Sequence, residues 1–96
     1  MVTVWSKSAK RELAKAFEYI SLESPKNAQK VVETIVDLTI SLSQAPLKHP
    51  LDKYKLNNDG SWRAFEKYSY RITYKVTENE IQIVRFRHTQ CSPLYF

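Results

Sequence analysis

The sequence predicts an α+β fold, in which an N-terminal helical hairpin packs on one face of an antiparallel sheet. Apolar residues recur with helical spacing through the first half of the chain and alternate with polar residues through much of the second half. The predicted element order is β-α-α followed by a β-meander of three strands. With 96 residues the chain is expected to form a single domain, residues 1–96, near the lower size limit for a self-sufficient hydrophobic core.

The first half of the chain contains one strand and two helices. Residues 2–5 are β-prone, and from about Ser8 the apolar spacing becomes helical, with one face made of Ala9, Leu13, Ala16, Phe17 and Ile20. Ser24-Pro25 predicts the start of the second helix, because the hydroxyl can cap a free N–H and proline is tolerated at the first helical position. This helix should run to about Ser43 on an apolar face of Ala28, Val31, Val32, Ile35, Leu38 and Leu42. Two such helices, a few residues apart, are expected to pack as an antiparallel hairpin.

The second half contains the turns and strands of the meander. Pro46 and Pro50 end the second helix, and residues 53–56 are expected to form a short strand. Residues 57–60, Asn-Asn-Asp-Gly, predict a turn that contains the only glycine of the protein. Three strands are then expected at residues 62–68, 70–76 and 81–86, the last two joined at Glu78-Asn79.

The charge of the chain favours a polyanionic partner. The formal net charge is +5 and the pI is about 9.4, which fits RNA, DNA or an acidic protein, although solubility alone is an alternative reason for a basic domain. Four of the five arginines lie in the second half: Arg63, Arg71, Arg85 and Arg87. The planar guanidinium suits phosphate better than the ammonium of lysine does.

Several classes of site are not expected. Cys91 is the only cysteine, so an intrachain disulfide cannot form, as suits a reducing cytosol. His49 and His88 are far apart in the sequence, and we expect neither a metal site nor any other cofactor. The chain has no signal-peptide pattern and no apolar run long enough to span a bilayer, so we expect a cytoplasmic protein without a membrane partner.

Strand alternation predicts which side chains share a face of the sheet. In residues 70–76 the even positions are apolar and should face the helices, which leaves Arg71 on the uncovered side, here called the open face. A two-residue turn at Glu78-Asn79 would pair Arg71 with Phe86 and place His88 beside them. It would also turn Arg85 and Arg87 to the helix side, with their charged ends reaching the sheet edge. A register shift of one residue would reverse these faces.

These residues define a candidate RNA-cleaving site. Arg71 would stabilise phosphate charge, His88 would transfer a proton, and Tyr95 would contribute a stacking ring or a hydroxyl. Cleavage through the RNA 2′-hydroxyl needs these functions and no metal. The residues predicted to bind the substrate are Arg63, Lys67, Arg85 and Arg87.

Structural roles remain open for each candidate. Arg71 could pair with Glu66 or Glu80, and His88 could be a solvent-facing residue or a hydrogen-bonded turn former. Tyr95 and Phe96 could anchor the tail to the sheet by packing. Arg63 and Lys67 share the strand parity of Arg71 only if no bulge intervenes at Ser69.

The chain resembles the RelE/ParE superfamily of toxins from bacterial type II toxin–antitoxin systems. The second half resembles that pattern in residues 63–76, RAFEKYSYRITYKV, and residues 81–89, IQIVRFRHT. The first half agrees in Trp5-Ser6-Lys7-Ser8-Ala9, in Ser24-Pro25 and in residues 42–46, LSQAP. The resemblance covers nearly the whole chain, and it rests on the order and spacing of these motifs together.

The resemblance implies the fold described above and a small antitoxin partner, whose acidic or amphipathic segment covers the basic surface of the toxin. It leaves two mechanisms open. RelE-like and YoeB-like relatives cleave ribosome-bound mRNA as metal-independent endoribonucleases, with Arg71, His88 and Tyr95 falling at or near their catalytic positions. ParE-like relatives inhibit DNA gyrase without catalysis, and the Arg-Phe-Arg-His segment, residues 85–88, is similar to that branch. Here the sequence favours the nuclease, with gyrase inhibition as the alternative. A third hypothesis is a family member without toxicity, either inactive or kept for plasmid maintenance.

Overall fold

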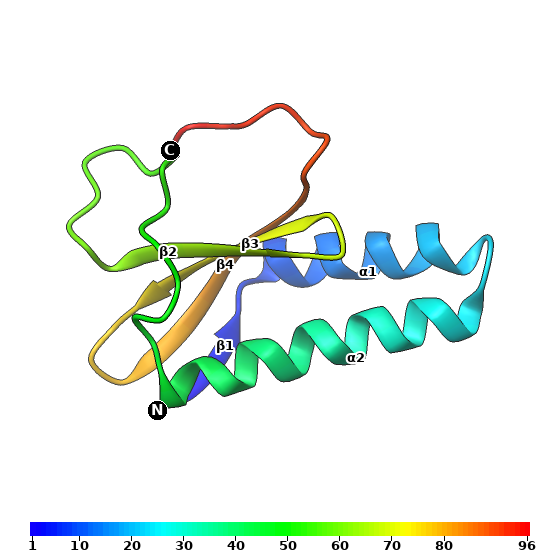
Figure 1. Ribbon diagram of the computed structural model, residues 1–96, viewed down its shortest axis with the longest axis horizontal. Helices are drawn as coiled ribbons and strands as arrows, with labels where there is room; N and C mark the ends of the chain where they lie inside the picture. The colour runs from blue at the N-terminus through cyan, green and yellow to red at the C-terminus, as the bar shows by residue number, and fades with distance from the viewer.

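The computed structural model describes residues 1–96, and it confirms the predicted α+β class. The elements in chain order are β1 (Val2–Trp5), α1 (Lys7–Ser21), α2 (Pro25–Ser41), the 3-10 turn η1 (Leu42–Gln44), β2 (Trp62–Lys67), β3 (Tyr70–Val76) and β4 (Glu80–His88). The helices lie side by side on one side of the sheet, and the C-terminal tail and the later part of the loop before β2 lie on the other (Figure 1). Neither helix combines the length and the apolar character that crossing a membrane would need.

Serine caps begin both helices, as the sequence predicts for the second. The Ser6 hydroxyl accepts a hydrogen bond from Ala9 N–H at 3.0 Å, and the Ser24 hydroxyl accepts one from Asn27 N–H at 3.1 Å. Pro25 occupies the first turn of α2, where its missing N–H costs nothing. The helical hairpin therefore starts where local sequence chemistry requires it to start.

The sheet has the strand order β1-β4-β3-β2 and is mixed. The pairs β2–β3 and β3–β4 are antiparallel, as predicted for the meander, whereas β1 runs parallel to β4 at the sheet edge. Ser6 N–H donates to Ile83 O at 2.9 Å, and the Thr3 hydroxyl donates to Thr39 O of α2 at 2.9 Å. The prediction of a wholly antiparallel sheet is therefore wrong for β1, because alternation identifies a strand but not the direction of its neighbour.

A β-bulge in β4 changes the predicted register. Val76 pairs with Ile81 and Tyr74 with Ile83, as predicted, but Thr73 pairs with Arg85, so that β4 has one extra residue at Val84. Beyond the bulge every side chain of β4 therefore lies on the face opposite to the one that the predicted register gives it.

The bulge corrects three placements. Phe86 pairs with Ile72 and is buried under the helices, so the prediction that it lies on the open face is wrong. His88 pairs with Tyr70 and lies toward the same side as Phe86. Arg85 and Arg87 pair with Thr73 and Arg71 and lie on the open face, not on the helix side.

The short strand predicted at residues 53–56 is absent. Asp52 prevents it, because its carboxylate accepts the Tyr54 N–H at 3.0 Å and its carbonyl accepts the Lys55 N–H at 3.2 Å. These bonds fold the segment into turns, and only Leu51 forms a single bridge, to Arg63. The segment between η1 and β2 is a long loop. It starts on the helix side, where Pro46 O accepts the Tyr74 hydroxyl at 2.8 Å, passes the edge of β2 at Leu51 and continues on the open face, where Asp52 meets Arg71.

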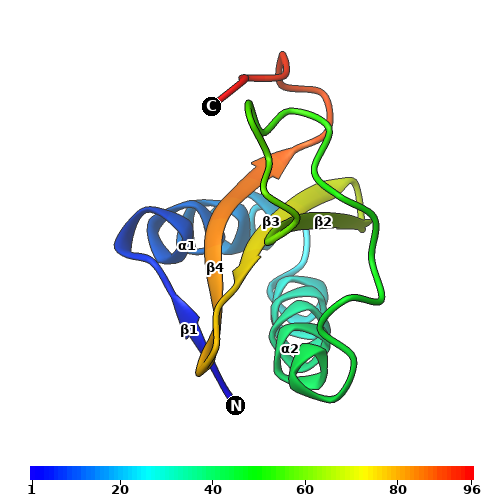
Figure 2. The ribbon, with the colours of Figure 1, turned by 90° about the vertical axis from the view of Figure 1, so that its left-hand side faces the viewer.

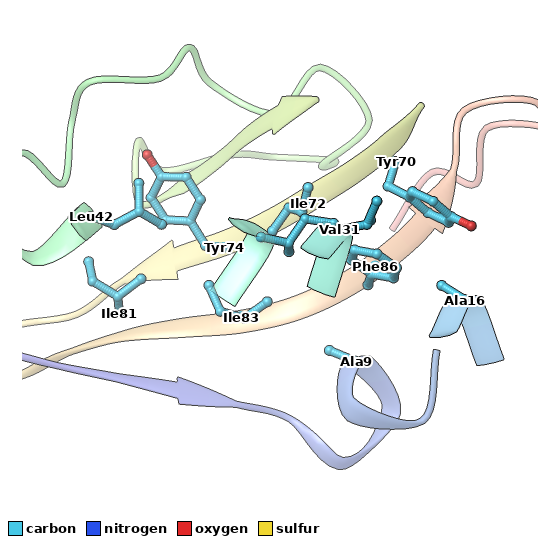
Figure 3. Close-up of a cluster of buried hydrophobic side chains, with 11 residues drawn as sticks. Ala9, Ala16, Val31, Leu42, Tyr70, Ile72, Tyr74, Ile81, Ile83 and Phe86 are labelled. Atoms are coloured by element: carbon cyan, nitrogen blue, oxygen red, sulfur yellow. The ribbon is translucent and has the colours of Figure 1, made fainter. Parts of the chain in front are cut away.

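The core lies between the sheet and the helical hairpin. Tyr70 stacks on Phe86 with ring centroids 4.8 Å apart, and both rings lie over the helices, as Figure 3 shows. The buried cluster consists of Ala9, Ala16, Val31, Ile35, Leu42, Tyr70, Ile72, Tyr74, Ile81, Ile83 and Phe86. The apolar even positions of β3 therefore face the helices, as predicted, and the open face is left for polar groups.

Candidate functional site

Three arginines converge on the open face of the sheet. Arg71 of β3 lies directly opposite Arg87 of β4, and Arg85 lies opposite Thr73 two residues further along the strands. All three line a cavity of about 60 Å³ that the C-terminal tail partly closes. Directly opposed like charges destabilise a strand pair, so this arrangement requires compensation by negative groups.

The buried carboxylate of Asp52 supplies most of this compensation. It is 2% exposed, and it accepts hydrogen bonds from Arg71 Nη2 at 2.9 Å and from the Thr73 hydroxyl at 2.8 Å. Glu66, which is exposed, accepts a second bond from Arg71 Nη1 at 3.4 Å. Arg71 therefore lies between two carboxylates. Its pairing with Glu66 is one of the structural alternatives that the sequence left open.

The carboxylate of Asp52 stays ionised in this setting. Burial by itself raises its pKa, but hydrogen bonds from the Tyr54 N–H, Arg71 and Thr73, together with the charge of Arg71, lower the pKa below its ordinary value of 3.8. Burial lowers the pKa of Arg85, and the charges of Arg87 and Arg71 act in the same direction while Asp52 opposes them. The site therefore holds cations that are short of negative partners.

Acid is expected to weaken the fold through Asp52. Because the folded-state pKa lies below 3.8, the stabilisation by Asp52 is present above that value and is lost as the pH falls through 3.8 toward the folded-state pKa. Thermal unfolding from about pH 5 to about pH 2 should show a steeper fall in Tm for the wild type than for Asp52→Asn. Parallel profiles for the two proteins would contradict this assignment.

Beyond β4 the C-terminal tail turns back toward the loop before β2 (Figure 2), and two arginines of β4 bond to it. Arg85 Nη1 donates to Leu94 O at 2.8 Å, and Arg87 Nη2 donates to Ser92 O at 3.2 Å. Phe96 N–H donates to Tyr54 O at 3.0 Å, which ties the end of the tail to the loop. The tail thus uses its backbone carbonyls to satisfy two arginines that have no carboxylate partner.

The predicted catalytic residues each make contacts within the fold. His88 reaches the cavity rim, but its ring packs edge-on against Tyr70 at 5.1 Å and its Nδ1 accepts the Gln90 N–H at 3.1 Å. Tyr95 is 65% exposed and packs edge-on at 5.5 Å against Tyr54, which lines the cavity, but Tyr95 itself does not line it. Arg71 is bonded to the carboxylates of Asp52 and Glu66.

The predicted substrate-binding residues divide into two pairs. Arg85 and Arg87 lie with Arg71, whereas Arg63 and Lys67 pair with Tyr74 and Tyr70 and therefore point to the other face. Arg63 Nη1 donates to His49 O at 2.8 Å, and the Lys67 ammonium lies 4.9 Å from the Tyr68 ring centroid. Arg63 therefore binds the loop before β2 and is not part of the arginine site.

Sequence reasoning did not identify Asp52 or Tyr54 as part of the site. Tyr54 connects Arg71 to the tail. The Arg71 guanidinium lies 4.8 Å over the Tyr54 ring, and the Tyr54 carbonyl accepts the Phe96 N–H. The available signal was the isolation of Asp52 as the only acidic residue in positions 45–58, which otherwise contain three lysines. No group of three or more His, Cys, Asp or Glu side chains is arranged to hold a metal ion.

Solved structures of toxin–antitoxin proteins share this fold. The chain matches the chromosomal ParDE toxin–antitoxin system of P. aeruginosa with a TM-score of 0.72 and 24% identity, covering 94% of this chain and 97% of that one. It matches the RelBE2 toxin–antitoxin complex of Mycobacterium tuberculosis with a TM-score of 0.61 and 19% identity, covering 91% and 88%. It matches the YoeB dimer of Staphylococcus aureus with a TM-score of 0.58 and 19% identity, covering 92% and 95%. At these identities the likeness shows the fold.

The architecture thus places the protein in the RelE/ParE fold class. Residues 3–92 match the family described as ParE toxin of type II toxin-antitoxin system, parDE. The chain belongs to this family of toxins, and the resemblance seen in the sequence is confirmed. A comparison with curated proteins finds no significant match.

Proposed function

We propose that this toxin acts by binding and inhibiting DNA gyrase, without chemistry of its own, and that a cognate antitoxin silences it. The ParE family assignment supports the first part. The basic open face supports the second, because an acidic or amphipathic antitoxin segment would find unneutralised arginines there. This choice reverses the preference that the sequence gives to mRNA cleavage.

The state of Arg71 carries the proposal. An arginine that stabilises phosphate charge in a transition state must present free donors to the substrate. Here two of its nitrogens are bonded to Asp52 and Glu66, and substrate would have to compete with both carboxylates. His88 and Tyr95 each contact a neighbouring ring, and this further favours a binding surface in preference to a cleavage site.

Ribosome-dependent mRNA cleavage is the second candidate. One observation favours it, since His88 lines the same cavity as the three arginines. In this mechanism Arg71 would act on phosphate and His88 or Tyr95 would transfer a proton, on ribosome-bound mRNA.

A His88→Ala variant separates the two mechanisms. Loss of a general acid or base lowers a catalysed rate by about 10²- to 10⁴-fold, whereas a binding inhibitor should change by no more than about twofold. We expect the purified variant and wild type to inhibit supercoiling by DNA gyrase equally. Growth inhibition after induction should also persist in His88→Ala and Tyr95→Phe cells.

The control is a map of RNA 5′ ends in the same induced cells. Intact messages together with gyrase-linked DNA breaks would support the proposal. Unchanged supercoiling, combined with codon-phased mRNA cleavage that His88→Ala abolishes, would reject it and establish the nuclease.

A further inference from the structure

We propose that Ser6 is a positioning residue of the arginine site, because its hydroxyl fixes the β-bulge of β4 at Val84. The position of the bulge in turn places Arg85 opposite Thr73, on the cavity that Arg71 also lines. The inference deepens the proposed function, and it rests on that function in taking Arg85 to lie on the surface that inhibits gyrase. Ser6 lies between β1 and α1 in the chain, and β1 runs beside β4 in the sheet (Figures 1 and 2).

Burial requires a bulge in β4 but does not decide its position. The core residues on the two sides of the bulge, Ile83 and Phe86, are both buried. Two residues between them, Val84 and Arg85, therefore stand against the single Thr73 of β3. Either of the two could pair with Thr73, and both choices leave the core residues on the helix side. A further contact has to select one of them.

Ser6 supplies that contact through hydrogen bonds to two successive carbonyls. Its N–H donates to Ile83 O at 2.9 Å, and its hydroxyl donates to Val84 O at 3.1 Å. The carbonyls of successive residues point to opposite edges of a regular strand, so one residue beside the strand cannot meet both. If Val84 paired regularly with Thr73, its carbonyl would point to β3 and the Ser6 hydroxyl would lose this acceptor. The hydroxyl therefore recognises the bulge at Val84.

The same hydroxyl begins α1. The Ser6 Oγ accepts the Ala9 N–H at 3.0 Å while its own hydrogen is donated to Val84 O. A hydroxyl has one hydrogen to donate and two lone pairs, so both bonds form together. Ser24 caps α2 in the same way, with the Asn27 N–H at 3.1 Å, but its hydroxyl bonds to no strand. The two serines thus differ in the contact with the bulge, and Ser24 is a matched control.

The position of the bulge decides where the Arg85 guanidinium lies. Opposite Thr73, Arg85 lines the cavity of the arginine site. Val84, the extra residue, borders a separate hollow beside Trp62 and Lys75. If the two residues exchanged roles, a valine would stand opposite Thr73 and the guanidinium would move one residue along the strand, about 3.3 Å.

Nuclear magnetic resonance of the purified toxin tests the position of the bulge directly. In Ser6→Ala the ratio of the two positions should shift by about fivefold, from the loss of one hydrogen bond, so that both are populated. Cross-strand contacts of Thr73 with Val84 should then appear in addition to those with Arg85. Amide relaxation at residues 84 and 85 should show exchange on the microsecond to millisecond timescale.

Three further variants separate the bulge contact from the helix cap. Ser6→Asp keeps an acceptor for the Ala9 N–H but has no hydrogen to donate to Val84 O, so it should also populate both positions. Ser6→Thr keeps both functions of the hydroxyl and should retain the wild-type pattern. Ser24→Ala should lower Tm by about 5 °C and leave the bulge unchanged. Circular dichroism of each variant establishes that it is folded.

Inhibition of supercoiling by purified gyrase connects Ser6 to Arg85. Arg85→Gln should raise the half-inhibitory toxin concentration by about fivefold, from the loss of one charged contact. Ser6→Ala should raise it by about twofold, because about half of the molecules then hold the guanidinium in place. Ser6→Ala/Arg85→Gln should be no weaker than Arg85→Gln alone, since Ser6 acts through that side chain. Ser24→Ala should match the wild type.

The wild-type pairing of Thr73 with Arg85 in both Ser6→Ala and Ser6→Asp would overturn the inference, since the bulge would then hold its position without Ser6. The same exchange in Ser24→Ala would also overturn it, by showing a general effect of helix capping. Additive losses in the double variant would show that Ser6 does not act through Arg85. If the wild-type toxin leaves supercoiling unchanged, the proposed function fails, and the comparison by magnetic resonance still decides what fixes the bulge.

Discussion

Replacing Asp52 by alanine is expected to lower the free energy of unfolding by about 3 kcal/mol, because removal of one partner of a buried ion pair leaves the other charge uncompensated. The change removes the acceptor of Arg71, of the buried Thr73 hydroxyl and of the Tyr54 N–H together. Arg71 would then lie directly opposite Arg87 with only the exposed Glu66 as a partner. Calorimetry or urea unfolding measures the loss, which corresponds to a fall in Tm on the order of 15 °C.

Asp37→Ala is the matched control, since Asp37 is exposed on α2 and its removal should change stability by no more than about 0.5 kcal/mol. The double variant Asp52→Ala/Arg71→Met should recover part of the lost stability, because it removes the unpaired charge as well. Equal stability of Asp52→Ala and the wild type would mean that the carboxylate does not hold the open face together.

Replacing Phe86 by alanine is expected to cost about 4 kcal/mol, which tests the bulge directly. Phe86 is 1% exposed, stacks on Tyr70 and lies 6.1 Å from the Trp5 ring. Truncating it leaves a cavity between the sheet and α1, and the free energy of unfolding measures that cavity. In the register without a bulge Phe86 would lie on the open face, and the same change would cost far less.

Phe17→Ala provides the comparison. Phe17 is 39% exposed on α1, so its truncation should cost about 1 kcal/mol. Similar losses for the two phenylalanines would indicate that Phe86 is not in the core and that the β3–β4 register lacks the bulge.

Part of the candidate site could be predicted from single residues, but its assembly could not. Arg71, Arg85 and Arg87 were all predicted to bind substrate or to catalyse, from their residue type and position on the strands. Their grouping on one face depends on the extra residue Val84. The apolar positions change parity there, from Ile81 and Ile83 to Val84 and Phe86, but this trace in the sequence does not by itself give the pairing with β3. The choice of Asp52 as their counter-ion depends on the path of a loop with two prolines, and local sequence does not determine that path.

The sequence by itself determined the two helices, the serine cap of the second, the strands of the meander, the apolar face of β3 and the resemblance to a toxin superfamily. These features depend on spacing and chemistry within a few neighbouring residues, so they can be predicted without the tertiary structure. The tertiary structure alone decided the parallel edge strand β1, the face of Phe86 and His88, and the carboxylates that hold Arg71. Each of these depends on which distant segments meet, and in a sheet a shift of one residue moves every later side chain to the opposite face.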